Sequence, residues 1–173
     1  MIYRIAVPED LPRIVKLYKA VAHAGGAIAR REEEITDEFV NNFMSNSFNT
    51  GLIIVGEHPD NPDELIAEIH AYKAGIKLFD HVLTNLTLLV HPEHQRKKIG
   101  RTIFTIFLEE IARHRPDIGK VELFTNELNA PALGLYSSLG FKVEGRMEMR
   151  VKTPKGQYLA DIPMGWQNPN YEF

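Results

Sequence analysis

Apolar and polar residues alternate along the chain with two different periods, which together predict a mixed α/β protein. In four segments the apolar residues recur every three or four positions, the spacing of one buried helix face. Seven shorter segments are apolar throughout or alternate apolar with polar residues, as strands do. The predicted helices cover residues 8–22, 36–44, 100–114 and 129–140, and the predicted strands cover residues 2–7, 51–57, 65–75, 85–90, 120–125, 141–151 and 158–166.

Residues at the predicted helix ends support these boundaries. Asp10, Thr36 and Asn129 stand where a side-chain oxygen can cap a helix N-terminus. Gly140 stands where a helix ends. The element order is β-α-α-β-β-β-α-β-α-β-β, a run of strands followed by alternating strands and helices. This order predicts a single α/β domain over residues 1–173, with a mixed sheet and helices on both faces.

Composition narrows the class of protein. The chain has 173 residues, of which 44% are hydrophobic and 25% charged, and it has no cysteine. A soluble domain of this size buries a core without disulfides. The absence of cysteine excludes thiolate zinc sites and cysteine nucleophiles, and it favours a cytoplasmic location.

Charge and hydropathy also argue against a signal peptide, a membrane partner and a nucleic-acid partner. The chain does not begin with a basic segment followed by an apolar run, so we expect no signal peptide. Apolar stretches stay well short of the ~18 residues that a membrane span needs, so we expect no membrane partner. The formal net charge of −3 argues against a dedicated nucleic-acid binder.

A basic cluster nevertheless lies in the segment HPEHQRKKIGRTIF, residues 91–104. Because the segment joins a predicted strand to a predicted helix, its last residues present backbone N–H groups at a helix N-terminus, where an anion is favoured. Lysine and arginine side chains add charge-assisted hydrogen bonds to a phosphate. The alternatives are a solvated helix start that binds nothing, and a nucleic-acid patch, which the lack of interleaved aromatic residues disfavours. The basic residues are Arg96, Lys97, Lys98 and Arg101.

The segment from Val90 to Gly100 resembles the acetyl-CoA loop of the GCN5-related N-acetyltransferase (GNAT) superfamily. The superfamily pattern is Val-x-Pro-x-x-(Gln/Arg)-x-x-Gly-x-(Gly/Ala), and Gln95 and Gly100 match its first and last loop positions. Lys98 stands where the superfamily has its first glycine. A glycine adopts left-handed backbone angles freely, whereas a lysine there costs about 1 kcal/mol or more.

A second segment, FTNELNAPALGLYSSLGF, resembles the other signature of the same superfamily. Asn129, Tyr136, Gly140 and Phe141 fall at the matching positions. Residues 2–18 are similar to the superfamily's first strand and helix. Residues 144–166 are similar to the branch that includes amino-acid and phosphinothricin-type acetyltransferases. The resemblance covers nearly the whole chain and is weakest over residues 22–50, where these enzymes bind the acceptor.

The resemblance implies a single-domain GNAT-like fold, a mixed and mostly antiparallel sheet with splayed central strands and helices on both faces. It implies acetyl-CoA as the co-substrate and no metal. The backbone of Leu88, Leu89 and Val90 would bind the pantetheine arm together with Asn129, and Tyr136 would protonate the leaving sulfur. The pyrophosphate would lie against the loop and first helical turn formed by Gln95, Arg96, Lys97, Lys98, Ile99, Gly100, Arg101 and Thr102.

The implied activity is transfer of an acetyl group to the primary amine of a small molecule or amino acid. Two alternatives remain: acetylation of a protein N-terminus or lysine, and a non-catalytic acyl-CoA-binding module. A homodimer is common in the superfamily and is compatible with the chain.

The general base stays open among several side chains. Glu68 and His70 share one face of the predicted strand 65–75, and His81 precedes the strand 85–90. Asn85 and Thr87 share a face of that strand, but neither is basic. The pattern favours a half-exposed strand residue or a structural histidine for each ionisable candidate, and an ordered water relay needs no dedicated side chain.

The acceptor region is also open. The charged residues His23, Arg30, Arg31 and Glu32–Glu34 either line the acceptor pocket or form a solvated loop. Asp161 either lines the pocket or pairs with Arg146 or Arg150. His91 and His94 suggest a metal, but they lack an obvious third ligand, so we expect none.

Overall fold

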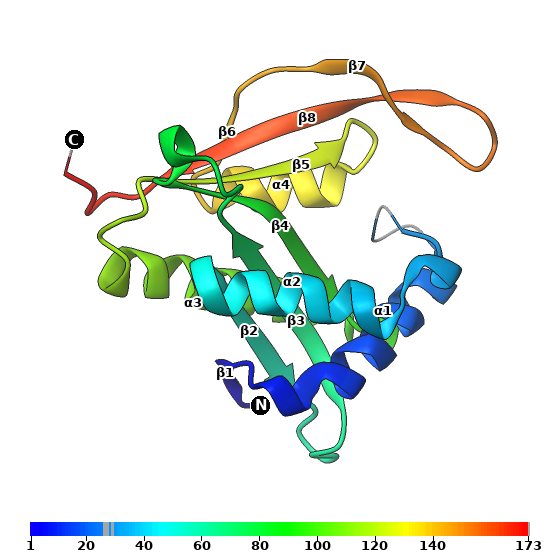
Figure 1. The fold of residues 1–173 in the computed structure, drawn as a ribbon. Coiled ribbons are helices and arrows are strands. Elements are labelled where there is room, and N and C mark those ends of the chain that lie inside the picture. The colour runs from blue at the N-terminus through cyan, green and yellow to red at the C-terminus, as the bar shows by residue number, and fades with distance from the viewer. Residues whose placement is uncertain (26–27, 29, 173) are drawn as a thin grey trace.

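The computed structural model describes residues 1–25, 28 and 30–172, and over these residues it forms one eight-stranded sheet with four α-helices (Figure 1). The helices are α1 (Leu11–Ala24), α2 (Asp37–Thr50), α3 (Ile99–His114) and α4 (Ala130–Ser138). The strands are β1 (Tyr3–Ile5), β2 (Leu52–Glu57), β3 (Leu65–Tyr72), β4 (Val82–Val90), β5 (Lys120–Asn126), β6 (Lys142–Val143), β7 (Met147–Lys152) and β8 (Tyr158–Gln167). The predicted order is confirmed, except that the single strand predicted over 141–151 is divided into β6 and β7.

The strands lie in the order β1-β2-β3-β4-β5-β8-β6, and β7 also pairs with β8. Neighbouring described strands are antiparallel except β4 and β5, which are parallel. Pairing of β4 with β5 is limited to Val82 opposite Lys120 and Leu83 opposite Val121. Beyond these residues the two strands diverge, and the sheet continues as two halves that run in different directions (Figure 1). The mixed, mostly antiparallel sheet with splayed central strands is therefore confirmed.

Two helices cover each face of the sheet. Helices α1 and α2 pack on β2 and β3 through a core that includes Ile14, Tyr18 and Phe43. Helix α3 packs on the opposite face through residues such as Ile103 and Phe107, and α4 joins the same core. Helices α1, α2 and α3 thus bury the apolar face that their sequence period indicated, whereas the apolar residues of α4 are only partly buried. Within the part of the chain that the structure describes, no helix is long and apolar enough to cross a membrane.

The predicted helix caps are only partly observed. Thr36 accepts a hydrogen bond from the Phe39 N–H at 3.1 Å, and Asn129 accepts one from the Ala132 N–H at 3.3 Å, so both cap their helices. The prediction for Asp10 was wrong, because its side chain makes no cap hydrogen bond to α1. The Asp10 carboxylate is buried instead, and it accepts hydrogen bonds from the Arg4 and Arg13 guanidinium groups.

Candidate functional site

The divergence of β4 from β5 leaves one edge of β4 without a strand partner among the described residues. Asn85, just past the last paired residue, has a left-handed backbone with φ of 54°. On its other edge β4 remains paired with β3, and the His91 N–H donates to the Ile66 carbonyl. Backbone groups alternate in direction along a strand, so the N–H and C=O groups of Leu88 and Val90 face the divergent side, and those of Leu89 face β3. The unpaired edge can hold an extended ligand by backbone hydrogen bonds.

The loop from β4 to α3 forms a cradle of backbone N–H groups. Arg96 and Lys98 both have left-handed backbones, with φ of 62° and 64°. Among the described residues, none accepts a hydrogen bond from the backbone N–H groups of residues 96–101. Turns that alternate between right- and left-handed conformations direct successive N–H groups inward, and such concavities bind anions. Lys98 therefore adopts the conformation for which a glycine is usual, as its place in the loop pattern indicated.

The cations around this cradle are also free of carboxylates. Within the described chain, no ion pair engages Arg96, Lys97, Lys98 or Arg101. The side chains of residues 95–98 are exposed, whereas Ile99 is buried and anchors the loop in the core. Unpaired N–H groups beside unpaired cations are the donor set that a pyrophosphate requires.

Three polar side chains of the predicted phosphate site are already engaged within the protein. The Gln95 amide donates to the Val90 carbonyl at 3.2 Å and folds the loop back onto β4. The Arg101 guanidinium donates to the Ser138 hydroxyl at 2.8 Å and ties α3 to α4. The Thr102 hydroxyl donates to the Lys98 carbonyl at 3.2 Å. These three side chains shape the cradle, and the free donors are the backbone N–H groups and the neighbouring lysines.

Tyr136 lies on α4, on the sheet face that α3 also covers. Its ring packs edge-on against Phe104 at 5.7 Å between centroids and lies 6.1 Å from the Phe141 ring. Its hydroxyl has no hydrogen-bond partner among the described residues. Burial raises the pKa of Tyr136 to about 12. The phenol is therefore protonated at neutral pH and can donate a proton to a group placed beside it.

The opposite face of the sheet carries a polar cluster that the sequence pattern only partly indicated. Glu68 and His70 were expected to be half-exposed or structural, and both are buried, with exposures of 0% and 3%. Tyr18 of α1 reaches into the same cluster. His81, the other candidate, is exposed at the start of β4, where its carbonyl accepts hydrogen bonds from Gly119 and Lys120 next to the paired end of β5.

Charged residues of the expected acceptor region pair mostly with one another. His23 lies 3.1 Å from Glu32, and Arg30 lies 3.4 Å from Glu34. The Arg30 guanidinium also stands 4.7 Å over the Phe39 ring. Further along the chain, Asp161 pairs with Arg150 at 3.3 Å and not with Arg146. The charged residues His23, Arg30 and Glu32–Glu34 therefore form an exposed, ion-paired surface beside α2.

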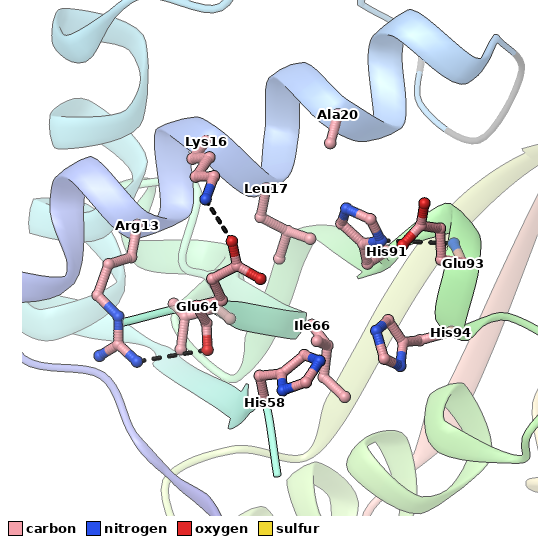
Figure 2. A pocket seen from close by; sticks show the side chains of 11 residues that line it. Arg13, Lys16, Leu17, Ala20, His58, Glu64, Ile66, His91, Glu93 and His94 are labelled. Carbon is pink, nitrogen blue, oxygen red and sulfur yellow. Dashed lines mark hydrogen bonds and ion pairs between the residues drawn. The ribbon is translucent and has the colours of Figure 1, made fainter. Parts of the chain in front are cut away.

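A separate pocket lies behind the start of the β4–α3 loop, between the loop and α1 (Figure 2). Three histidines line it, and the Nδ1 atoms of His58 and His91 each accept a backbone N–H. Burial lowers the pKa of His94, and the nearby Lys97 lowers it further. Among the residues that the structure describes, no group of three or more histidine, aspartate or glutamate side chains is arranged to hold a metal ion.

Comparison with known proteins shows similarity to acetyltransferases in both sequence and fold. A model of the acetyltransferase (GNAT) family matches residues 18–141. A ribosomal-protein-alanine N-acetyltransferase from Brucella melitensis superposes with a TM-score of 0.82 at 20% identity, covering 96% of this chain and 99% of that one. A phosphinothricin acetyltransferase from Sinorhizobium meliloti, solved in complex with acetyl-CoA, superposes with a TM-score of 0.82 at 18% identity, covering 98% and 89%.

One curated relative matches a shorter stretch. The UPF0157 protein YqkA of Bacillus subtilis is 42% identical over 62 residues, which make up 36% of this chain and 17% of that protein. The chain thus matches only a small part of that relative's length. The two solved structures, in contrast, are similar over 96% and 98% of this chain.

Proposed function

The chain belongs to the acetyltransferase (GNAT) family, and from this premise we propose that it transfers an acetyl group from acetyl-CoA to the primary amine of a small molecule or amino acid. The observation that carries the proposal is the N–H cradle at residues 96–101, whose backbone donors lack protein acceptors and whose flanking cations form no ion pair among the described residues. It adjoins the unpaired edge of β4. A cradle for a pyrophosphate that continues into an edge for an extended amide chain suits coenzyme A.

The residues present fit each part of this co-substrate. The N–H groups of the loop and the side chains of Lys97 and Lys98 would hold the pyrophosphate. The Leu88 backbone and the Val90 N–H would hydrogen-bond the pantetheine amides, as strands do with an extended peptide, while the Val90 carbonyl already accepts from Gln95. When bound, acetyl-CoA supplies the activated thioester that the amine attacks.

The chain's own groups then lower the barrier in two ways. A backbone N–H on the free edge of β4 would polarise the thioester carbonyl and stabilise the developing oxyanion. Tyr136, protonated at neutral pH, would donate its proton to the sulfur as the carbon–sulfur bond breaks. We assign Asn129 to the end of the pantetheine arm, since its amide N–H₂ makes no hydrogen bond to any described residue while its oxygen caps α4.

A screen of acceptor amines tests the proposal. The purified protein is incubated with acetyl-CoA and single amines, namely the proteinogenic amino acids, spermidine, benzylamine and a lysine-containing peptide, and free thiol is measured. We expect thiol release that depends on one of the small amines. Release with the peptide alone would assign a protein acceptor. Stabilisation of the fold by acetyl-CoA with no release for any amine would indicate a binding module and refute the proposed activity.

A further inference from the structure

Glu68, His70 and Tyr18 form a hydrogen-bonded cluster beneath α1 and α2. Glu68 and His70 are two positions apart on β3, so their side chains point to the same face of the sheet. The His70 Nδ1 lies 2.9 Å from the Glu68 Oε1. The Tyr18 hydroxyl donates to the Glu68 Oε2 at 3.1 Å and also lies 3.4 Å from the His70 Nδ1.

The geometry of this cluster is compatible with one simple placement of its protons. Tyr18 is fully buried, and its burial, together with the nearby Glu68 carboxylate, raises its pKa well above the usual value, so its hydroxyl keeps its proton and donates. The hydrogen bond between the His70 Nδ1 and the Glu68 Oε1 contains one proton. Within the described residues, no lysine or arginine pairs with the Glu68 carboxyl group, and the His70 imidazole is its one possible ion-pair partner. With the shared proton on Nδ1, the carboxylate is satisfied and His70 Nε2 carries a lone pair.

The His70 ring is held in one plane. It stacks on the Phe43 ring of α2 at 4.2 Å with an interplanar angle of 9°, and it lies nearly parallel to the Tyr72 ring at 6.0 Å. No residue that the structure describes makes a hydrogen bond to its Nε2. The side chain retains 4% of its surface exposed. The histidine therefore has one nitrogen engaged and the other free.

The position of His70 relates this free nitrogen to the reaction. His70 lies directly opposite Thr87 of β4, whose other edge is the one that diverges from β5. The Thr87 side chain reaches the Tyr18 hydroxyl, so it stands on the same face as the cluster. Tyr136 belongs to the core on the other face. The two ionisable sites thus flank the divergence of β4 and β5 from opposite faces of the sheet.

We propose that His70 is the general base of the acetyl transfer, and that Glu68 and Tyr18 position it and stabilise its imidazolium form. The proposal rests on the proposed function. His70 Nε2 takes a proton from the acceptor ammonium, and the freed amine attacks the thioester carbonyl. The carbon–nitrogen bond forms, the carbon–sulfur bond breaks, and the sulfur takes a proton from Tyr136. The second nitrogen proton returns to the Tyr136 oxygen through water, and His70 releases its proton to solvent.

A purely structural role explains the cluster less well. A buried carboxylate and imidazole lose hydration on folding, and well-packed apolar side chains of similar volume are often as stable or more so. The same carboxylate–imidazole pair, with the distal nitrogen free, orients and strengthens a histidine base in other enzymes. Titratable and charged groups near His70 are Glu68 and Tyr72 on its own strand, Tyr18 on α1, and Arg30, which acts on Tyr72. The facing residues Phe43 of α2, Thr87 of β4 and Ile53 of β2 are uncharged.

The first test is kinetic and uses the small amine that gives the fastest thiol release. His70→Gln should lower kcat about 100-fold, remove the acidic limb of the kcat/KM profile against pH, and leave the KM for acetyl-CoA within about twofold of wild type. Glu68→Gln retains the hydrogen bonds of the cluster but can donate to Nδ1, which moves the proton to Nε2. It should also lower kcat, by about 10-fold or more, with little change in melting temperature.

His81→Gln is the matched control, since it removes an exposed histidine at the paired end of β4. It should retain wild-type rates and the wild-type pH profile. Unchanged kcat and an unchanged acidic limb in a folded His70→Gln protein would overturn the assignment while leaving the acetyltransferase activity intact. Absence of transfer by the wild-type protein would instead refute the proposed function itself, and the base with it.

A measurement on the wild-type protein keeps the inference falsifiable if the variants fail to fold. Nitrogen NMR of the ¹⁵N-histidine-labelled protein reports which ring nitrogen of His70 carries the proton. We expect the neutral tautomer protonated on Nδ1, with Nε2 free. A proton on Nε2 of the neutral ring would overturn the proposal.

Discussion

Lys98 shows at the residue scale how the loop tolerates a departure from the family pattern. Its left-handed backbone, with φ of 64° and ψ of 4°, lies at the N-cap of α3. Such a conformation costs a non-glycine residue about 1 kcal/mol. Backbone strain of this kind persists where the surrounding structure over-determines it, often at ligand sites. In return, the position carries an ammonium group beside the N–H cradle.

Substitutions at Lys98 separate strain from charge. Lys98→Gly and Lys98→Ala both remove the ammonium, but only glycine relieves the left-handed backbone. We expect Lys98→Gly to be more stable than Lys98→Ala by about 1 kcal/mol in urea unfolding. Both variants should bind acetyl-CoA more weakly than wild type. Equal stability of the two variants would show that this backbone is not strained.

The proposed role of Tyr136 depends on a single atom, its hydroxyl oxygen. Tyr136→Phe removes a hydroxyl that makes no hydrogen bond among the described residues, so the melting temperature should change little. We expect kcat to fall about 100-fold while the affinity for acetyl-CoA is retained. Because burial raises the pKa of this phenol to about 12, wild-type activity should not be lost through Tyr136 between pH 7 and about pH 10. Unchanged turnover would remove Tyr136 from the acid role.

At the scale of elements, ion pairs of the Asp10 carboxylate connect β1 to the start of α1. Asp10 pairs with Arg4 of β1 and with Arg13 of α1. Burial raises the pKa of Asp10, but hydrogen bonds from Arg4 and from the Val7 N–H outweigh it, so the pKa lies below its usual value. The ion-pair distances are 2.6 Å to Arg4 and 2.8 Å to Arg13. A lowered carboxyl pKa contributes stability that is present above the unfolded pKa and lost as the pH falls through the folded one.

Asp10→Asn should therefore destabilise the protein by about 2 kcal/mol at neutral pH, because two guanidinium groups lose a buried partner. The difference from wild type should shrink as the pH falls below about 4, where the carboxyl of the unfolded chain takes up its proton, and it should go on shrinking until the folded carboxylate is protonated at lower pH. Glu57→Gln is the control, since Glu57 pairs with Arg4 at a more exposed position, and it should cost under about 1 kcal/mol. A pH-independent difference would contradict the role given to the charge of Asp10.

The exposed cations of the loop between β4 and α3 should contribute to acetyl-CoA binding without contributing to stability. Arg96→Gln combined with Lys97→Gln removes two exposed cations that pair with no carboxylate in the described chain. We expect about 10-fold weaker acetyl-CoA binding by calorimetry and a smaller dependence on salt, with unchanged stability. Arg113→Gln, which removes one positive charge in the last turn of α3, is the control and should bind as wild type does. Equal loss in both variants would make the effect one of net charge.

The sequence predicted the helices and strands better than it predicted the burial and the contacts of individual polar side chains. Helix periods and the caps at Thr36 and Asn129 were readable because they depend on neighbouring residues. The capping role of Asp10 was wrong because Arg4, on a different element, binds the carboxylate. The burial of Glu68 and His70 was also hidden: two polar residues alternating on a strand indicate a solvated face, and only the packing of α1 and α2 covers them.

At the scale of the whole molecule, the divergence of β4 from β5 organises the candidate site. The N–H cradle lies at the end of β4, Tyr136 belongs to the core under α3 and α4, and the His70 cluster lies under α1 and α2. The motifs in the sequence indicated the cradle and the tyrosine separately. Their arrangement around one divergent strand pair depends on long-range pairing that no local pattern encodes.

The most direct measurement of the central claim follows the acetyl group itself. The protein is incubated with acetyl-CoA labelled with ¹³C at the acetyl carbonyl and with the panel of small amines, and the label is followed by NMR. The account predicts that the thioester signal declines and an amide signal of one amine grows at the same rate, at a rate that Tyr136→Phe and His70→Gln reduce. A label that remains on the thioester while acetyl-CoA saturates the protein would contradict it.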